Sequence, residues 1–401
     1  MSAREGQEVQ RHLLSCKSSA DLLEVAEREG HRFDAIHSTT CLYRLAKLRS
    51  AGNNAHGDES CRRAALGPLP RIQLRFAVQL ATPSATLRQR GWEAQMLANT
   101  AWAFATLLVR DGPLFDAISS ASISRIPNFR PQHLANTAWA FATLCVLDAP
   151  LLDSIACAAI KKMAEFKAQD CANTVWSFAA LRCVDPPLFD ALSSAALNLM
   201  EVYTTVDLTQ TAWSLAICQC RDVPLMSAIA SRSIPNIWAF AIQDIGNIVW
   251  AFATLTFSDT PLFESSACAS QLKIHEATPQ TLANTAWAYA TLSECHEPLF
   301  DAISASALVT ISEFDEQSLS ILAWSFATLA YCNRPLLHAI SKASLPMLPE
   351  FKTQGLTNTV WAYAVIYSMS SDSGLLTRGM FSDGDASSTS EAGVHQNLIV
   401  K

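Results

Sequence analysis

The chain lacks the short motifs that mark common catalytic sites. It has no Gly-x-x-x-x-Gly-Lys-[Ser/Thr] phosphate loop, no His-Glu-x-x-His metal helix and no Gly-x-Ser-x-Gly nucleophile turn. Its 12 cysteines are scattered without the paired spacing of a zinc site, and only His31 and His37 among the nine histidines lie near each other. We therefore expect no catalytic residues, no metal and no cofactor.

Long apolar runs and a strong basic balance are absent as well. No run of 18 apolar residues is free of polar groups, so no transmembrane helix is predicted. The basic residues near the N-terminus are interrupted by acids such as Glu5 and Glu8, which does not predict a transit peptide. Residues 92–370 hold 13 Lys and Arg against 23 Asp and Glu, a net charge of −10. Lys and Arg provide the phosphate contacts of nucleic-acid-binding proteins, so few such contacts are expected here.

What the chain does contain is a tryptophan that recurs every 37 residues, eight times, without insertion or deletion. A fixed period of this length is the signature of a repeat array, in which each unit packs against its neighbours. Counted from this tryptophan, earlier residues have negative positions and later ones positive positions. The eight tryptophans, which we expect to form the structural core, are Trp102, Trp139, Trp176, Trp213, Trp250, Trp287, Trp324 and Trp361.

Each 37-residue unit is predicted to contain two helices. The proline at +11, present in seven units, suits a first helical turn, and the aspartate two residues before it in five units can cap that helix. The second helix follows the aromatic residue at −10 and ends near +5. Because this helix is almost free of charge, we expect it to be buried on all sides between neighbouring repeats. The predicted fold is all-α, an extended α-solenoid of eight two-helix repeats.

The ends of the chain differ from the repeats. Residues 1–49 are predicted to form a degenerate helical repeat that caps the array, in which Tyr43 takes the place of the tryptophan because Phe33 lies ten residues before it. Residues 50–68 are predicted to be a linker and residues 69–369 the solenoid, with Leu69 to Arg90 as its first helix. Residues 370–401, rich in Ser, Asp and Gly, are predicted to be a disordered polar tail.

The unit Phe-x-x-Gln-x-Leu-Ala-Asn-Thr-Ala-Trp-Ala-Phe-Ala-Thr-Leu, followed by Pro-Leu-Phe, resembles the octotricopeptide repeat from Leu69 to about Met369. It is also similar to the helical repeats of FAST-kinase-like and RAP-domain proteins. The resemblance implies a non-catalytic RNA-binding protein of the mitochondrion or chloroplast that acts in RNA processing, stability or translation. Its partners would be single-stranded RNA from organellar transcripts or ribosomal RNA, with possible protein partners and no membrane insertion. Without the resemblance, the missing transit peptide favours the cytoplasm.

Helical repeats that read RNA vary their base-contacting residues on a constant scaffold. Variation here is concentrated at −9, −8 and −6, at the start of the second helix, whereas the glutamine at −7 is nearly constant. We expect RNA along this edge, where helix N–H groups are also free to meet phosphate. The candidate RNA-binding residues are Arg130, Lys167, Lys352, His133, Gln132, Gln169 and Gln354.

The same residues also have interpretations that involve no ligand. A helix start facing solvent varies in any protein, and the asparagine at −3, present in six units, fits a hydrogen-bonding ladder between repeats better than a ligand contact. The alternative function is an armadillo- or HEAT-like scaffold whose asparagines hold an extended peptide or a basic protein partner. The acidic array favours this scaffold, and the family resemblance favours RNA.

Overall fold

The computed structural model describes residues 3–30, 33, 35–51 and 92–372 of the chain. These residues form helices joined by turns, with no β-strand among them, so the predicted all-α solenoid class is confirmed. Most of the expected linker at 50–68, the helix expected over Leu69 to Arg90 and nearly all of the expected tail at 370–401 lie outside the described residues. The last described helix runs to Asp372, slightly beyond the predicted end of the solenoid.

The described residues fall into two compact units, Met1–Asn236 and Ile237–Lys401. The division lies within a 3₁₀ turn, η5 (Ile234–Ala239), which is six residues long where the corresponding turns of the other repeats have three. The tryptophan period runs through this point unchanged, so the spacing alone could not have predicted the division.

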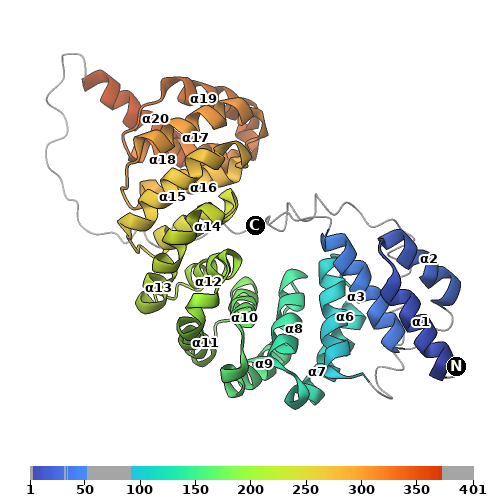
Figure 1. Ribbon diagram of the computed structural model, residues 1–401. Coiled ribbons are helices and arrows are strands. Elements are labelled where there is room, and N and C mark those ends of the chain that lie inside the picture. The colour runs from blue at the N-terminus through green and yellow to red at the C-terminus, as the bar shows by residue number, and fades with distance from the viewer. Residues whose placement is uncertain (1–2, 31–32, 34, 52–91, 373–401) are drawn as a thin grey trace. The chain divides into compact units, whose positions relative to one another are not determined.

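The first unit contains a helical cap and four tryptophan-bearing repeats (Figure 1). We call the helix that carries the repeated tryptophan the Trp helix, and the helix that follows it, with proline in its first turn, the Pro helix. The cap consists of α1 (Ala3–Ser15), α2 (Ser19–Glu29) and α3 (Ala35–Ala51). The Trp helices are α6 (Ala94–Thr106), α8 (Pro131–Thr143), α10 (Ala168–Ala180) and α12 (Thr205–Ile217). The Pro helices are α7 (Gly112–Arg125), α9 (Ala149–Lys161), α11 (Pro186–Leu199) and α13 (Val223–Ser233).

The second unit repeats the same two-helix pattern (Figure 1). Its Trp helices are α14 (Ile242–Thr254), α16 (Pro279–Thr291), α18 (Glu316–Thr328) and α20 (Thr353–Asp372). Its Pro helices are α15 (Thr260–Lys273), α17 (Glu297–Thr310) and α19 (Arg334–Met347). Three-residue 3₁₀ turns end the Pro helices, as at η6 (Ile274–Glu276), η7 (Ile311–Glu313) and η8 (Leu348–Glu350).

Within each unit, every Trp helix packs along the Trp helix of the neighbouring repeat, and the Pro helices form a second layer. The small residues at −1, +1 and +3 make this approach possible: in α8, Ala138, Ala140 and Ala142 are all buried. Stability is therefore shared between each repeat and its immediate neighbours, as in other solenoids.

Aromatic pairs hold the two layers together across successive repeats. Phe115 of α7 meets Phe141 of α8 edge to face, with ring centroids 4.9 Å apart. The same contact, again between residues 26 apart, recurs in the second unit at 5.0 and 5.1 Å, in the pairs Phe263–Tyr289 and Phe300–Phe326. Such pairs add about 0.5–1.5 kcal/mol each beyond the area they bury. The aromatic residue at +2 is therefore the central core residue of the repeat.

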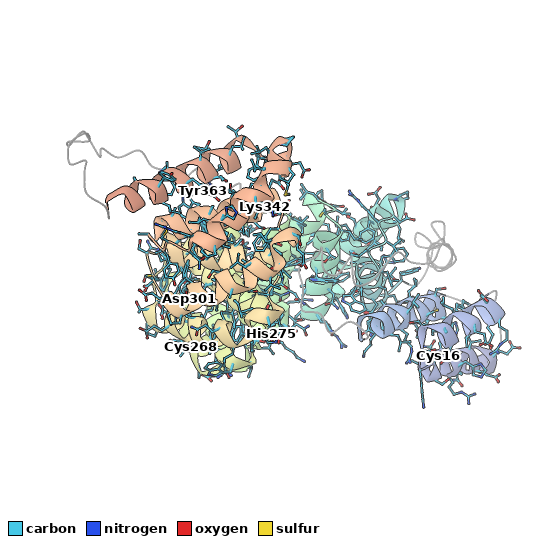
Figure 2. The ribbon with its side chains drawn as sticks, turned by 90° about the horizontal axis from the view of Figure 1, so that it is seen from above. Cys16, Cys268, His275, Asp301, Lys342 and Tyr363 are labelled. Atoms are coloured by element: carbon cyan, nitrogen blue, oxygen red, sulfur yellow. The ribbon has the colours of Figure 1, made fainter. Side chains whose placement is uncertain are left out.

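Two tyrosines at this +2 position add a hydrogen bond to the packing. Tyr289 donates its hydroxyl to the carbonyl oxygen of Phe263 at 2.6 Å. Tyr363, labelled on α20 in Figure 2, donates to the carbonyl oxygen of Leu337 on α19 at 2.5 Å. Burial raises the pKa of Tyr363 to about 12, so the hydroxyl keeps its proton and remains a donor at neutral pH.

The predicted cap of the array is present. The hydroxyl of Ser18 accepts the backbone N–H of Asp21 at 3.1 Å, and the Asp21 carboxylate accepts that of Ser18, which closes a capping box at the start of α2. The ring of Tyr43 on α3 lies 5.1 Å from that of Trp102 on α6. Tyr43 therefore continues the tryptophan series, as its spacing from Phe33 predicts. The helix α1, which precedes the expected pair, was not predicted.

The predicted caps of the Pro helices are confirmed. In five repeats the aspartate at +9 accepts the backbone N–H of the leucine at +12 at 2.9 or 3.0 Å; these residues are Asp111, Asp148, Asp185, Asp222 and Asp259. The next two repeats use other acceptors at the same position, the Nδ1 atom of His296 and the Oδ1 atom of Asn333. The proline follows two residues later, where its missing N–H costs no helical bond.

We predict that Asp185→Ala lowers the free energy of unfolding by about 1 kcal/mol, because the first turn of α11 loses its side-chain acceptor. The matched control is Asp190→Ala, which removes an exposed carboxylate from the same helix and should change stability by less than about 0.5 kcal/mol. Urea unfolding followed by circular dichroism compares the two variants. Equal effects would contradict the capping role.

Each Trp helix with a following Pro helix ends in a left-handed residue that is not glycine. The residues at +6 all have φ between 50° and 57°: Leu108, Cys145, Arg182, Gln219, Thr256, Ser293 and Ala330. The next residue closes the turn by donating its N–H to the carbonyl at +2, as Tyr331 does to Phe326 at 2.9 Å. This is a Schellman-type helix end, at which glycine is the least strained residue.

Ala330→Gly is therefore expected to raise the free energy of unfolding by about 1 kcal/mol, because it relieves left-handed strain at an exposed position. The control is Ala305→Gly, an exposed position inside α17, where the same change should cost about 0.5–1 kcal/mol. Opposite signs in thermal unfolding would support the strained turn, and two destabilised variants would refute it.

Candidate nucleic-acid interface

In α8 and α10, one stripe of the Trp helix remains open to solvent, which corrects the expectation that every Trp helix is buried on all sides. The stripe holds positions −7, −3 and 0, which share one face because they are four and three residues apart. In α8 these are Gln132, Asn136 and Trp139; the glutamine is exposed and the other two are partly exposed. In α10 the same positions are Gln169, Asn173 and Trp176, with the same pattern of exposure. We call these residues the Gln–Asn–Trp stripe.

The tryptophans are less buried than a core position requires. Trp250 and Trp287 are buried, but Trp102, Trp139, Trp176, Trp213 and Trp324 are only partly covered, and Trp361 is 44% exposed. The expectation that all eight form the core is thus corrected in favour of the +2 residue. The reason is rotation along the helix: two residues turn the side chain by about 200°, so the two aromatics point to opposite faces.

The asparagines at −3 do not form the expected ladder between repeats. Among the described residues, no hydrogen bond is made by the side-chain amides of Asn99, Asn136, Asn173, Asn247, Asn284 and Asn358, and all six are partly exposed. Neighbouring hydroxyls do bond within their own helix: Thr174 donates to the carbonyl oxygen of Asp170 at 2.7 Å. The amides are therefore available to a ligand.

The positive residues predicted to bind RNA lie immediately before the Trp helix of their repeats. Arg130, Lys167 and Lys352 are exposed, and their side chains make no hydrogen bond or ion pair with a described residue. Lys167 does interact electrostatically with the Asp170 carboxylate. Arg130 and Lys167 immediately precede α8 and α10, at −9, on the same unit. Lys352 belongs to the second unit. The structure thus brings two of the three predicted cations into adjacent repeats.

The variable position −6 has a structural role that the sequence analysis missed. The Nδ1 atom of His133 accepts the backbone N–H of Arg130 at 3.2 Å, and the carboxylate of Asp170 accepts that of Lys167 at 3.1 Å. Asp207 does the same for Thr204 at 3.0 Å. Burial raises the pKa of the Asp170 carboxyl. In these three repeats the residue at −6 is therefore a capping group, and His133 uses one ring nitrogen for the cap.

The glutamines at −7 lie at the start of the stripe. Gln132 and Gln169 are exposed, and neither side chain makes a hydrogen bond with a described residue. Gln354, in the second unit, is partly exposed and does interact with another residue. The first two glutamines are therefore better placed to meet a ligand than the third.

Other cations of the array hold the repeats together. Lys162 follows α9 and donates to the carbonyl oxygens of Pro127 and Phe129 in the preceding repeat, the first at 2.8 Å. Lys273 ends α15 and makes the equivalent bonds in the second unit, to Trp238 and Phe240 at 2.8 and 2.5 Å. These lysines neutralise the carbonyl ends of the 3₁₀ turns and are not free for phosphate.

The fold and this surface define a helical-repeat protein of the α-solenoid class with a polar and aromatic stripe along its Trp helices. Among the described residues, no cluster of His, Cys, Asp and Glu has the arrangement of a metal site. Of the described helices, none is both long enough and apolar enough to cross a bilayer.

Residues 69–260 match the sequence model of the RNA-editing substrate-binding complex 6 protein family. The matched region is just under half of the chain and includes Arg130, Lys167 and the first five repeated tryptophans. No curated protein matches the chain. The octotricopeptide-repeat and FAST-kinase-like assignments are not confirmed by this comparison. The helical-repeat fold is confirmed by the structure.

The stripe was missed at the sequence level because an apolar helix suggested full burial. The signal was present in the spacing. Glutamine, asparagine and tryptophan recur at −7, −3 and 0, on the face opposite the apolar +2 position. A helical wheel of one repeat therefore separates the stripe from the core.

The cap at His133 predicts acid sensitivity. Burial, together with the charges of Arg130 and Lys162, holds the pKa of His133 below its ordinary value of 6.5. The unfolded chain then binds a proton more readily than the folded chain, so this contribution to stability is present above about pH 6.5 and is lost as the pH falls toward the folded value. Protonation also removes the Nδ1 acceptor of the cap.

We therefore expect the His133→Asp variant to lose less stability than the wild type between pH 7.5 and 5.5. The substitution introduces the carboxylate that caps the Trp helices of the next two repeats. Urea midpoints at the two pH values measure the difference. The control His338→Asp changes an exposed histidine of the second unit that makes no hydrogen bond with a described residue, and it should track the wild type. An identical loss in wild type and His133→Asp contradicts the assignment.

Proposed function

We propose that the chain is a non-catalytic RNA-binding protein that acts in RNA processing, stability or translation in an organelle. In this proposal, single-stranded RNA runs along the N-terminal edge of the Trp helices of the first unit. The observation that carries it is the position of Arg130 and Lys167, two exposed and unpaired cations that begin consecutive Trp helices.

Two further observations support the proposal. The RNA-editing substrate-binding complex 6 family, whose model matches residues 69–260, is named for RNA editing and for binding an editing substrate. Repeat solenoids, moreover, have extended surfaces suited to linear ligands. An assembly with other proteins is consistent with the family name and with the acidic array, because partners can supply cations that the array has in small number.

A protein-binding scaffold remains the second candidate, because a specific feature favours it. The partly exposed asparagine amides at −3 suit the backbone of an extended peptide as well as a base, and the net charge of −10 over residues 92–370 suits a basic partner. This candidate predicts no retention of RNA by the purified chain.

The test is binding of the full chain to a pool of random single-stranded RNA at about 50 and 200 mM salt. We expect retention at the lower salt and enrichment of a short motif. The double variant Arg130→Ala/Lys167→Ala should bind more weakly. It should also reduce the slope of log Kd against log salt by about 1.4, since each phosphate contact to a single strand contributes about 0.7.

The control is Arg110→Ala/Lys161→Ala, which removes the same charge from two exposed positions away from the starts of the Trp helices. It should lower affinity only through the net charge and leave the enriched motif unchanged. If the wild-type chain retains no RNA at 50 mM salt, the proposed function is wrong and the scaffold candidate replaces it.

A further inference from the structure

An asparagine and a tryptophan form a pair that recurs in register on three consecutive Trp helices of the first unit, α6, α8 and α10. Asn136 and Trp139 of α8, and Asn173 and Trp176 of α10, are three residues apart and therefore neighbours on one helix face. The two helices pack against each other, and packed helices lie about 8–10 Å apart. Asn99 and Trp102 of the adjacent α6 extend the row by one repeat.

The amides in this row serve no structural purpose within the described residues. Each side chain is partly exposed, makes no hydrogen bond there, and offers two donors on its NH₂ group and an acceptor on its oxygen. That combination matches the donor and acceptor edge of a nucleobase, to which asparagine bonds through two atoms at once. Nothing in the packing of the repeats requires an asparagine at this position, as Gln210 and Ile321 show in the equivalent sites.

The indole rings of the row have surface available for stacking. Trp102 contacts Tyr43, and Trp176 contacts Trp213 with ring centroids 6.4 Å apart. Trp139, which lies between these two pairs, is partly exposed and has no aromatic ring contact in the described part of the chain. Proteins that bind single strands use such aromatic side chains as platforms for bases.

The neutral residues and the cations of one repeat lie at different places along its Trp helix. The only acidic or basic residues in α8 and α10 are His133 and the buried Asp170, and neither belongs to the stripe, so the stripe is neutral where the amides and indoles lie. The cations Arg130 and Lys167 stand six residues before Asn136 and Asn173, at the helix start. A nucleotide has the same division, with a charged phosphate and an uncharged, π-faced base. A peptide has no anion at each residue to match these cations.

We propose that the Asn–Trp pairs of α8 and α10 bind the bases of single-stranded RNA, with Trp139 as the stacking platform and Asn136 and Asn173 as base-edge contacts. The phosphates lie toward Arg130 and Lys167. The inference rests on the proposed RNA-binding function and names the surface, the atoms and the part of the nucleotide that each contacts. It assigns base recognition to the stripe, whereas the sequence pattern predicted it at the variable residues of the helix start.

The first test compares Asn136→Ala/Asn173→Ala with the matched control Asn128→Ala/Asn198→Ala, which removes two exposed amides from the 3₁₀ turn η2 (Ile126–Asn128) and from α11. Kd values for the enriched RNA are measured at several salt concentrations. The stripe variant should raise Kd at least about tenfold, with an unchanged salt slope because no phosphate contact is lost. The control should stay within about twofold of the wild type. Both variants should keep the wild-type urea midpoint, since neither amide pair bonds within the described fold.

The second test uses an abasic oligonucleotide of the same length, which keeps the phosphates and lacks the bases. The wild type and the stripe variant should bind it equally weakly. A stripe variant that binds the base-bearing RNA as well as the wild type does, or that loses equal affinity for the abasic strand, overturns the assignment to bases. Absence of RNA binding by the wild type instead refutes the underlying function, whereas capture of an extended peptide that depends on the same asparagines assigns the stripe to the scaffold candidate.

Discussion

The packing of each Trp helix against the Trp helix of the next repeat is the contact on which the rest of each unit depends. Small residues at +1 and +3, alanine or serine, occur on every such helix and allow this close approach; in α8 the buried Ala138, Ala140 and Ala142 occupy −1, +1 and +3. An inserted residue would turn these positions away from the neighbouring helix by about 100°. The unbroken 37-residue spacing follows from this requirement, because each repeat must present the same face in the same register.

The same packing determines which face of the Trp helix is left for a ligand. A helix with neighbours on two sides and a Pro helix behind it has only one narrow face left for solvent. On α8 and α10 this face contains glutamine, asparagine and tryptophan. Its polar side chains make no hydrogen bond between repeats among the described residues, whereas Lys162 does bond to the carbonyl oxygens of the preceding repeat. Residues that hold the repeats together and a surface open to a ligand therefore coexist in one 13-residue helix.

Much of this fold could be predicted from the sequence. The tryptophan period predicted the repeats. Proline at +11 with aspartate at +9 predicted the Pro helices and their caps, and the spacing of Phe33 and Tyr43 predicted the terminal unit. These features are local, so spacing is enough to find them.

The failures of prediction have different physical origins. Burial of the tryptophans was overestimated because hydrophobicity does not say which of two aromatic residues, at 0 or at +2, faces the Pro helix. The division near residue 236 leaves no mark on the tryptophan period, although it falls within the lengthened turn η5. The asparagine amides were expected to form hydrogen bonds between repeats, and only the structure shows that they do not. The last two properties depend on tertiary distances, whereas the first could have been read from the helical spacing.

We propose above that RNA contacts the open stripe of the Trp helices in the first unit. This contact can be detected by photochemical crosslinking of the full chain to single-stranded RNA containing 4-thiouridine, followed by mass spectrometry of the linked peptides. We expect crosslinks to the peptides of α8 and α10 that contain Trp139 and Trp176, and these should disappear when unmodified RNA is added in excess. Crosslinks concentrated on the Pro helices α9 and α11, with none on α8 or α10, would refute the contact.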